Sequence, residues 1–264
     1  MLYLIKFNCI AESSNGRTRS SGGRYWGSNP CSAASLNRYL YNLVMVKSYP
    51  DLVARFLLLC GILASLIYIG SDIIAAVSWQ GYNYAAQSVS ELRAIGSPTR
   101  DFLIPILSVY SVLEILFGIA VWKNSAKKRA LRITSVFLIT LGILDSMGPF
   151  FALNINEAFG SITNNIHVIV TAVTVLLIFL IIGFGATASK KWFRFYSIGT
   201  ILTLFAAGMT SFVNVQKFAT HQQASYAGVI ERINIYGYMI WVIVLAIVLL
   251  RSHRSNEKNK NVNI

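Results

Sequence analysis

The stretch LLLCGILASLIYIGSDIIAAV, residues Leu57–Val77, is apolar almost throughout and contains one charged side chain, Asp72. An α-helix needs ~20 mainly apolar residues to cross the ~30 Å hydrocarbon core of a bilayer, so this run predicts a membrane-spanning helix. Similar runs recur along the 264 residues, of which 55% are hydrophobic and 12% charged. That charged fraction is about half of what soluble domains carry. The sequence therefore predicts an all-α, polytopic membrane protein.

Six apolar runs are long enough to form a bundle of six transmembrane helices. The predicted spans are Leu52–Trp79, Asp101–Trp122, Ala130–Leu153, Ile162–Ala188, Phe195–Val215 and Glu231–Leu250. Residues 45–251 form the predicted six-span domain, and residues 252–264 form a polar cytoplasmic tail. Trp79, Trp122 and Trp192 lie at predicted span ends, where aromatic rings favour the headgroup layer, whereas Trp241 is predicted to pack inside its span.

Residues 1–44 differ from the rest of the chain because they are rich in Ser, Gly and Arg and have no apolar period. One interpretation is a disordered cytoplasmic arm. The preferred hypothesis is that they are not translated. The codons for GSNPC, residues 27–31, can resemble the T-arm of a transfer-RNA gene, and translation would then begin at Met45.

The basic residues predict the orientation of the chain. Of the 23 Lys and Arg residues, nineteen fall in the N-terminal segment, the loop between spans two and three, the loop between spans four and five, and the tail. Six spans place all of these segments on the same side of the membrane. The remaining four, Arg93, Arg100, Lys217 and Arg232, fall on the other side. Because cytoplasmic segments carry the excess of Lys and Arg, both termini are predicted to lie in the cytoplasm, and the protein in the plasma or inner cell membrane. The net charge of +13 then reflects topology and contact with anionic lipid, not nucleic-acid binding.

The polar segment Tyr82–Arg100 follows the first predicted span. Ser88 with Glu91 three residues later has the pattern of a capping box, so a short interfacial helix is expected to begin there on the extracytoplasmic face. Gly96 is expected to end this helix, and Pro98 to precede the next span. A second interpretation is that Ser90, Glu91 and Arg100 line a ligand pocket.

Two motifs resemble the domain-of-unknown-function 998 family of prokaryotic membrane proteins. The first runs Gln87-Ser88-Val89-Ser90-Glu91-Leu92 and is followed by Gly96, Pro98 and Thr99; the second is Gly228-Val229-Ile230-Glu231-Arg232-Ile233, followed by Trp241. With the six-span layout, the likeness covers Met45 to Arg251. The resemblance implies a compact six-helix bundle and carries no function with it.

Several ionisable groups occur at a similar depth, near the extracytoplasmic ends of the predicted spans. Such groups are costly in lipid and are expected to face the bundle, a partner or water, so they predict one outer-facing polar cavity. The candidate ligand-binding residues are Ser90, Glu91, Arg100, Asp72, Asp145, His167, Glu231 and Arg232. Arg232 is expected to pair with Asp145 or Glu91, and His167 with Asp72 or Asp145. The alternative for each is structural: a salt bridge, a packing histidine or a helix-terminal charge.

Glu114 is different because it lies near the middle of the second predicted span. It is the candidate for a proton relay. Several small residues within the spans are instead interpreted as points where helices pack closely. These are Gly61, Ser65, Gly118, Gly142, Gly183, Gly199 and Gly208.

The preferred function is binding of a membrane lipid or a small apolar molecule in the polar cavity, without a cofactor. One alternative is a metal-dependent intramembrane hydrolase similar to ceramidases, which would use Ser90, Asp145 and His167. The other histidines, His221 and His253, lie in a predicted loop and in the tail, and a zinc site needs about three protein ligands. Enzymatic activity is therefore not favoured, and no catalytic or metal-ligating residue is assigned. The other alternative is a proton-coupled transporter that uses Glu114.

Overall fold

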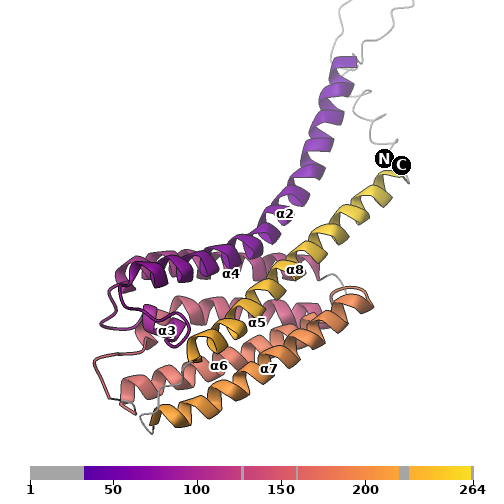
Figure 1. Ribbon diagram of the computed structural model, residues 1–264. Helices are drawn as coiled ribbons and strands as arrows, with labels where there is room; N and C mark the ends of the chain where they lie inside the picture. The colour runs from indigo at the N-terminus through magenta and orange to yellow at the C-terminus, as the bar shows by residue number, and fades with distance from the viewer. Residues whose placement is uncertain (1–32, 126–127, 159, 220–225, 263–264) are drawn as a thin grey trace, which may run out of the picture. The chain divides into compact units, whose positions relative to one another are not determined.

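The computed structural model describes the backbone of residues 33–125, 128–158, 160–219 and 226–262, and the side chains of residues 52–125, 128–158, 160–210 and 226–252. The described residues form seven α-helices and one 3₁₀ helix and contain no β-strand (Figure 1). They are α2 (Ala33–Ser78), α3 (Val89–Leu92), α4 (Arg100–Asn124), α5 (Arg129–Ser146), the 3₁₀ helix η1 (Gly148–Phe151), α6 (Ile162–Gly185), α7 (Lys191–Ala219) and α8 (Ala227–Val262). The chain divides into two compact units, residues 1–52 and 53–264, and the helices from Val53 onward pack as one bundle. Residues 1–32 of the predicted N-terminal extension, and His221 and the side chain of His253, lie outside the described residues.

Four of the described helices are long and apolar enough to cross a membrane. These segments are Leu52–Ser78, Arg100–Asn124, Ile162–Gly185 and Ala227–Ser252. They coincide with the first, second, fourth and sixth predicted spans, which are confirmed at this level. The third and fifth predicted spans are present as helices α5 and α7, but neither helix is among the four that are long and apolar enough to cross a membrane.

The third predicted span ends earlier in the structure than at Leu153. Helix α5 ends at Ser146, and the chain continues into η1. Pro149 explains this boundary, because proline lacks the backbone N–H that a continuing helix needs and disfavours helical geometry at the residue before it.

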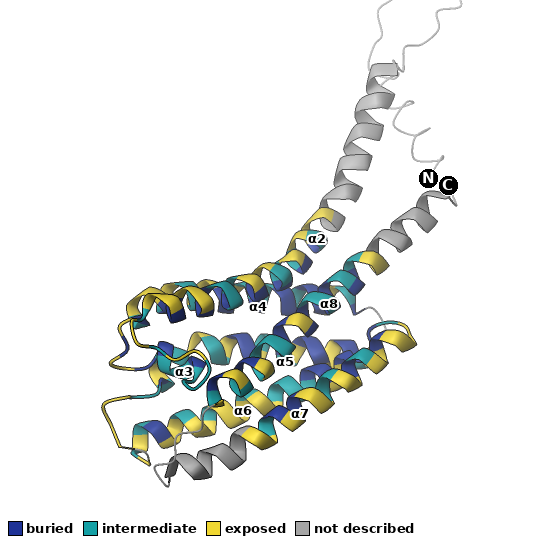
Figure 2. Cartoon of the chain, viewed as in Figure 1, coloured by how far each residue is buried: buried dark blue, intermediate teal, exposed yellow. Residues whose placement is uncertain are grey.

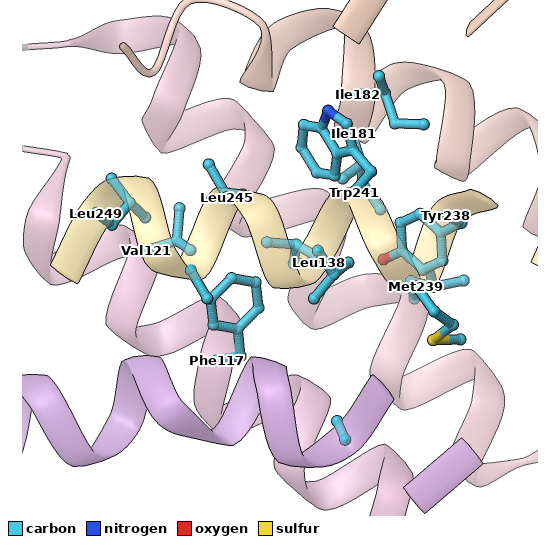
Figure 3. Close-up of a cluster of buried hydrophobic side chains, with 14 of the residues drawn as sticks. Phe117, Val121, Leu138, Ile181, Ile182, Tyr238, Met239, Trp241, Leu245 and Leu249 are labelled. Carbon is cyan, nitrogen blue, oxygen red and sulfur yellow. The ribbon is translucent and has the colours of Figure 1, made fainter. Parts of the chain in front are cut away.

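Helix α8 is the most buried of the four apolar helices. Of its most apolar window, 44% is buried, against 22% for α6. Its residues Tyr238, Trp241 and Leu245 are fully enclosed by side chains from α4, α5 and α6 (Figure 3). The Trp241 indole N–H donates to Ser197 Oγ of α7 at 3.0 Å, which confirms the predicted packing role of this tryptophan.

Many large apolar side chains lie on the outer surface of the bundle, and Figure 2 shows that the helices have exposed residues along their outer faces. Large side chains such as Val77 on α2, Ile169 on α6 and Phe195 on α7 are exposed. An apolar exterior around a close-packed interior suits a lipid surround, in which the hydrophobic effect no longer drives helices together.

Close helix packing occurs at only some of the predicted glycines. A Cβ added to Gly118 or Gly142 would lie 2.7 Å from a side chain of the facing helix, so α4 and α5 approach closely there. Gly61 is similarly close to Phe117. The prediction is wrong for Gly183, Gly199 and Gly208, because no atom of the described residues lies within 4 Å of a Cβ added at these positions. These three lie on α6 and α7, where the neighbouring space is open.

Candidate functional site

The polar residues gather at one end of the bundle, here named the α3 end. It is the end where α2 finishes, where α4, α6 and α8 begin, and where α3 and η1 lie (Figure 1). The predicted interfacial helix is present there as α3, with the predicted capping box. The Glu91 backbone N–H donates to Ser88 Oγ, and the Ser88 N–H donates to Glu91 Oε1 at 3.0 Å. Gly96, with φ of +94°, makes the turn that leads toward α4, a conformation that glycine adopts without a steric penalty.

A buried ion pair between Asp72 and Arg232 joins α2 to α8. Arg232 Nε donates to Asp72 Oδ2 at 2.9 Å and Nη2 donates to Oδ1 at 3.1 Å, with the two side chains 4% and 2% exposed. The Tyr236 hydroxyl also donates to Asp72 Oδ2. This two-pronged geometry is the strong form of an arginine–carboxylate pair.

The remaining guanidinium donors of Arg232 hold the loop that precedes α3. Nη1 donates to the Tyr84 carbonyl at 2.8 Å, and Nη2 donates to the Tyr82 hydroxyl at 3.0 Å. The Tyr82 hydroxyl in turn donates to the Ser88 carbonyl at 2.7 Å. Burial raises the pKa of Tyr82 to about 12, although its hydrogen bond with Arg232 acts in the opposite direction. The phenol therefore stays protonated at neutral pH and keeps both bonds.

Glu231 and Gly228 dock α3 against the beginning of α8. Glu231 Oε2 accepts a hydrogen bond of 2.9 Å from the Val89 N–H, the first amide of α3. The Val229 N–H donates to the Ala85 carbonyl at 3.1 Å. A Cβ on Gly228 would lie 2.1 Å from the Gln87 carbonyl oxygen, so only glycine allows this approach.

The predicted partners of Arg232 and His167 are corrected by this geometry. Arg232 pairs with Asp72, not with Asp145 or Glu91, because Glu91 is engaged in the capping box. His167 Nδ1 is hydrogen-bonded to the Phe151 carbonyl oxygen at 2.9 Å and holds η1 against α6, with no ion pair to Asp72 or Asp145 among the described residues. Ser90 forms a hydrogen bond with Ser88. Ser90, Asp145 and His167 thus have different partners, and the described residues contain no group of three His, Cys, Asp or Glu placed to hold a metal ion.

A cavity of about 30 Å³ lies at the α3 end between α2, the α3 turn, α4 and the α5–η1 junction. Its charged lining residues are Arg93, Arg100 and Asp145. Arg100 is fixed, because Nη1 donates to the Arg93 carbonyl at 2.7 Å and Nη2 to the Pro149 carbonyl at 3.2 Å. Two of the predicted ligand-binding residues, Arg100 and Asp145, therefore share one cavity, whereas Ser90, Glu91, Asp72, His167, Glu231 and Arg232 do not line it.

Arg93 is the lining residue that sequence reasoning missed. Its half-buried guanidinium forms no hydrogen bond or ion pair with any other residue in the described part of the chain, although it interacts electrostatically with Tyr68, Asp145 and Glu231. The interaction with Tyr68, followed by those with the two carboxylates, raises the pKa of Arg93 against the effect of burial. It is therefore a charged group with unused donors. Its place two residues after Glu91 in a polar segment was the available signal, but it entered the sequence analysis only as a topology charge.

Glu114 lies deeper, on α4, and is 3% exposed. Its Oε1 accepts a hydrogen bond of 2.9 Å from the Tyr238 hydroxyl of α8. Its Oε2 is buried and has no hydrogen-bond partner among the described residues. The charged group that acts most strongly on it is Asp145, which lines the cavity.

Several long apolar helices with an apolar exterior, joined by short polar loops, define a multi-pass membrane protein. Within that class, the profile of the family described as "Protein of unknown function (DUF998)" matches residues 62–248, and the chain belongs to this family. Both motifs that carried the resemblance lie inside the matched region. No curated protein and no solved structure was found to match the chain.

Proposed function

We propose that this protein crosses the cell membrane six times, with both termini in the cytoplasm, and binds a membrane lipid or another small, largely apolar molecule. The polar group of the ligand would enter the cavity at the α3 end, which would face the extracytoplasmic side. The observation that carries the proposal is the Arg93 guanidinium, which lines a cavity and has no hydrogen-bond partner among the described residues.

Six spans are supported by the way α5 and α7 pack. Helix α5 contacts both α4 and α6, and α7 contacts both α6 and α8. Both helices therefore run within the bundle of apolar helices. At ~1.5 Å per residue, the 18 residues of α5 extend about 27 Å and the 29 residues of α7 about 43 Å, against a core of ~30 Å. Basic residues such as Arg132 and Arg194 lower the mean hydropathy of these two helices without shortening them.

The size and opening of the cavity favour a ligand that inserts only its polar end. A volume of about 30 Å³ has room for about two water molecules, or for one small polar group. Of the twelve lining residues only Ser108 is exposed, and it lies on the flank of α4 about two turns into the helix. A ligand that enters the cavity past Ser108 would come from the flank of α4, so its apolar part would stay in the membrane.

The charges on the cavity wall favour an anionic polar group. Arg93 and Arg100 together exceed Asp145 by one positive charge. Arginine binds phosphate and carboxylate groups through paired N–H donors, and Arg93 has these donors unused. A phospholipid phosphate and a free anion share this chemistry, so the test must separate them.

The test is native mass spectrometry of protein purified in mild detergent and incubated with an anionic phospholipid, a zwitterionic phospholipid or inorganic phosphate. We expect the wild type to retain one anionic phospholipid, and Arg93→Ala to lower the affinity for this lipid about tenfold, the cost of losing one charge-assisted hydrogen bond. Arg251→Ala is the matched control, because Arg251 is exposed on α8 and remote from the cavity lining.

Equal retention by the wild type and Arg93→Ala would overturn the proposal. Binding of inorganic phosphate in place of lipid would assign the cavity to a free anion, and would overturn the lipid assignment. A loss in Arg251→Ala as large as that in Arg93→Ala would show non-specific attraction of lipid to basic residues.

A further inference from the structure

Among the described residues, the buried carboxyl group of Glu114 has fewer hydrogen-bond donors than a buried carboxylate needs. It is enclosed by α4, α5 and α8, and only its Oε1 is hydrogen-bonded, to Tyr238. A buried carboxylate oxygen that accepts no hydrogen bond has lost its contact with water without compensation, which strongly disfavours the ionised form. A proton on Oε2 removes the charge, and it leaves Oε1 as the carbonyl oxygen that Tyr238 already donates to.

Of the groups that act on Glu114 from the neighbouring helices, one can carry a charge at neutral pH. Tyr110 on α4 and Tyr238 on α8 are phenols, and Asp145 on α5 is the carboxyl group that acts on it most strongly. Asp145 also interacts with Arg93, which lies at the end of α3. The positive guanidinium of Arg93 favours the ionised form of Asp145 over that of Glu114, so within the pair we assign the proton to Glu114.

Asp145 connects this pair to the cavity. It is half-buried and lines the cavity, together with Arg93 and Arg100, whereas Glu114 is not part of the lining. The same cavity is bordered by Tyr110 and Ser111, on the turn of α4 that precedes Glu114. The only carboxyl group of the pair that water in the cavity can reach is therefore Asp145.

We propose that Glu114 and Asp145 together hold one exchangeable proton, which travels between the cavity and Glu114 by way of Asp145. Inward, a hydronium ion in the cavity gives its proton to an Asp145 carboxylate oxygen, and Asp145 passes a proton to the ionised Glu114. Asp145 becomes a carboxylate again and a water molecule remains in the cavity. Release follows the reverse order. The exchange needs no lipid in the cavity, so it is independent of the ligand proposed above.

The test is infrared difference spectroscopy of the protein in lipid vesicles at neutral pH, during exchange from H₂O to D₂O. The wild type should show the carbonyl band of a protonated carboxyl group, which shifts to lower wavenumber in D₂O. Glu114→Gln should remove this band, and Glu157→Gln, at an exposed carboxylate, should leave it unchanged. Asp145→Asn should keep the band and slow its deuterium shift at least tenfold.

A further variant keeps the test decisive if Glu114→Gln does not fold. Tyr238→Phe leaves Glu114 in place and removes the hydrogen bond to its Oε1, so the band should move to higher wavenumber. Absence of the band in the wild type, its persistence in Glu114→Gln, or an unchanged band in Tyr238→Phe would each overturn the proposal. Equally fast exchange in Asp145→Asn and the wild type would rule out Asp145 as the route.

Discussion

Arg232 is the residue that connects the most parts of the α3 end. Its guanidinium binds Asp72 on α2, the Tyr84 carbonyl and the Tyr82 hydroxyl, and it lies 3.6 Å from the centre of the Tyr84 ring. Each donor that burial removes from water is thus directed at an acceptor, which is the condition under which a buried ion pair is tolerated. Arg232 is therefore expected to stabilise the fold rather than bind a ligand.

Replacing Arg232 with Ala should lower the free energy of unfolding by about 3–5 kcal/mol, because it leaves the Asp72 carboxylate buried without its partner. Thermal unfolding in detergent, followed by tryptophan fluorescence, measures the change. Arg251→Ala, on the exposed part of the same helix, should change the midpoint by no more than a degree or so. An unchanged midpoint in Arg232→Ala would contradict the stabilising role of Arg232.

At this scale, the sequence predicted which residues are polar and at what depth, but not their partners. Asp72, Asp145, Glu231 and Arg232 all lie near the α3 end, as their positions in the spans predict. Spacing along a helix does not give the rotation of that helix about its axis, however, and this rotation decides whether Arg232 of α8 faces Asp72 on α2 or Asp145 on α5. The same gap explains why Arg93 was missed: its access to the cavity depends on how α3 docks against other helices.

Among the elements, α3 is too short to be stable alone and depends on its contacts. Its four residues are held by the capping box at its beginning and by Glu231 of α8, which accepts from the Val89 N–H. The capping box was predictable because it is a local pattern, Ser88 to Glu91. The docking was not, since it needs a close backbone approach at Gly228, more than a hundred residues away in the chain.

Gly228→Ala should destabilise the protein by about 1–3 kcal/mol, the usual cost of forcing an extra methyl group into a packed site. The added Cβ would collide with the Gln87 carbonyl oxygen and displace α3, so protease cleavage between Gly81 and Gly96 should also become faster. Gly70→Ala is the matched control, because no atom in the described part of the chain lies within 4 Å of its Cβ position and alanine favours the helix by ~1 kcal/mol. Similar stability of the two variants would refute the close approach at Gly228.

For the molecule as a whole, the sequence predicted the class and the family, and the structure adds how the helices pack. Apolar length alone identifies α2, α4, α6 and α8 as spans. Apolar length does not identify α5 and α7 as spans, because charged residues at their ends lower the mean hydropathy. Their inner faces still pack in the bundle. Whether these two helices cross the membrane determines the sides on which the α5–α6 and α6–α7 loops lie.

The most direct measurement is labelling of single cysteines on intact cells with a membrane-impermeant maleimide. The variants are Asn156→Cys and Lys190→Cys, at two exposed positions, in a background with Cys9, Cys31 and Cys60 replaced. Six spans with cytoplasmic termini predict that Asn156→Cys is labelled from outside and that Lys190→Cys is labelled only after the cells are opened. The reverse pattern, which a four-span chain with the same termini would give, would contradict six spans with cytoplasmic termini.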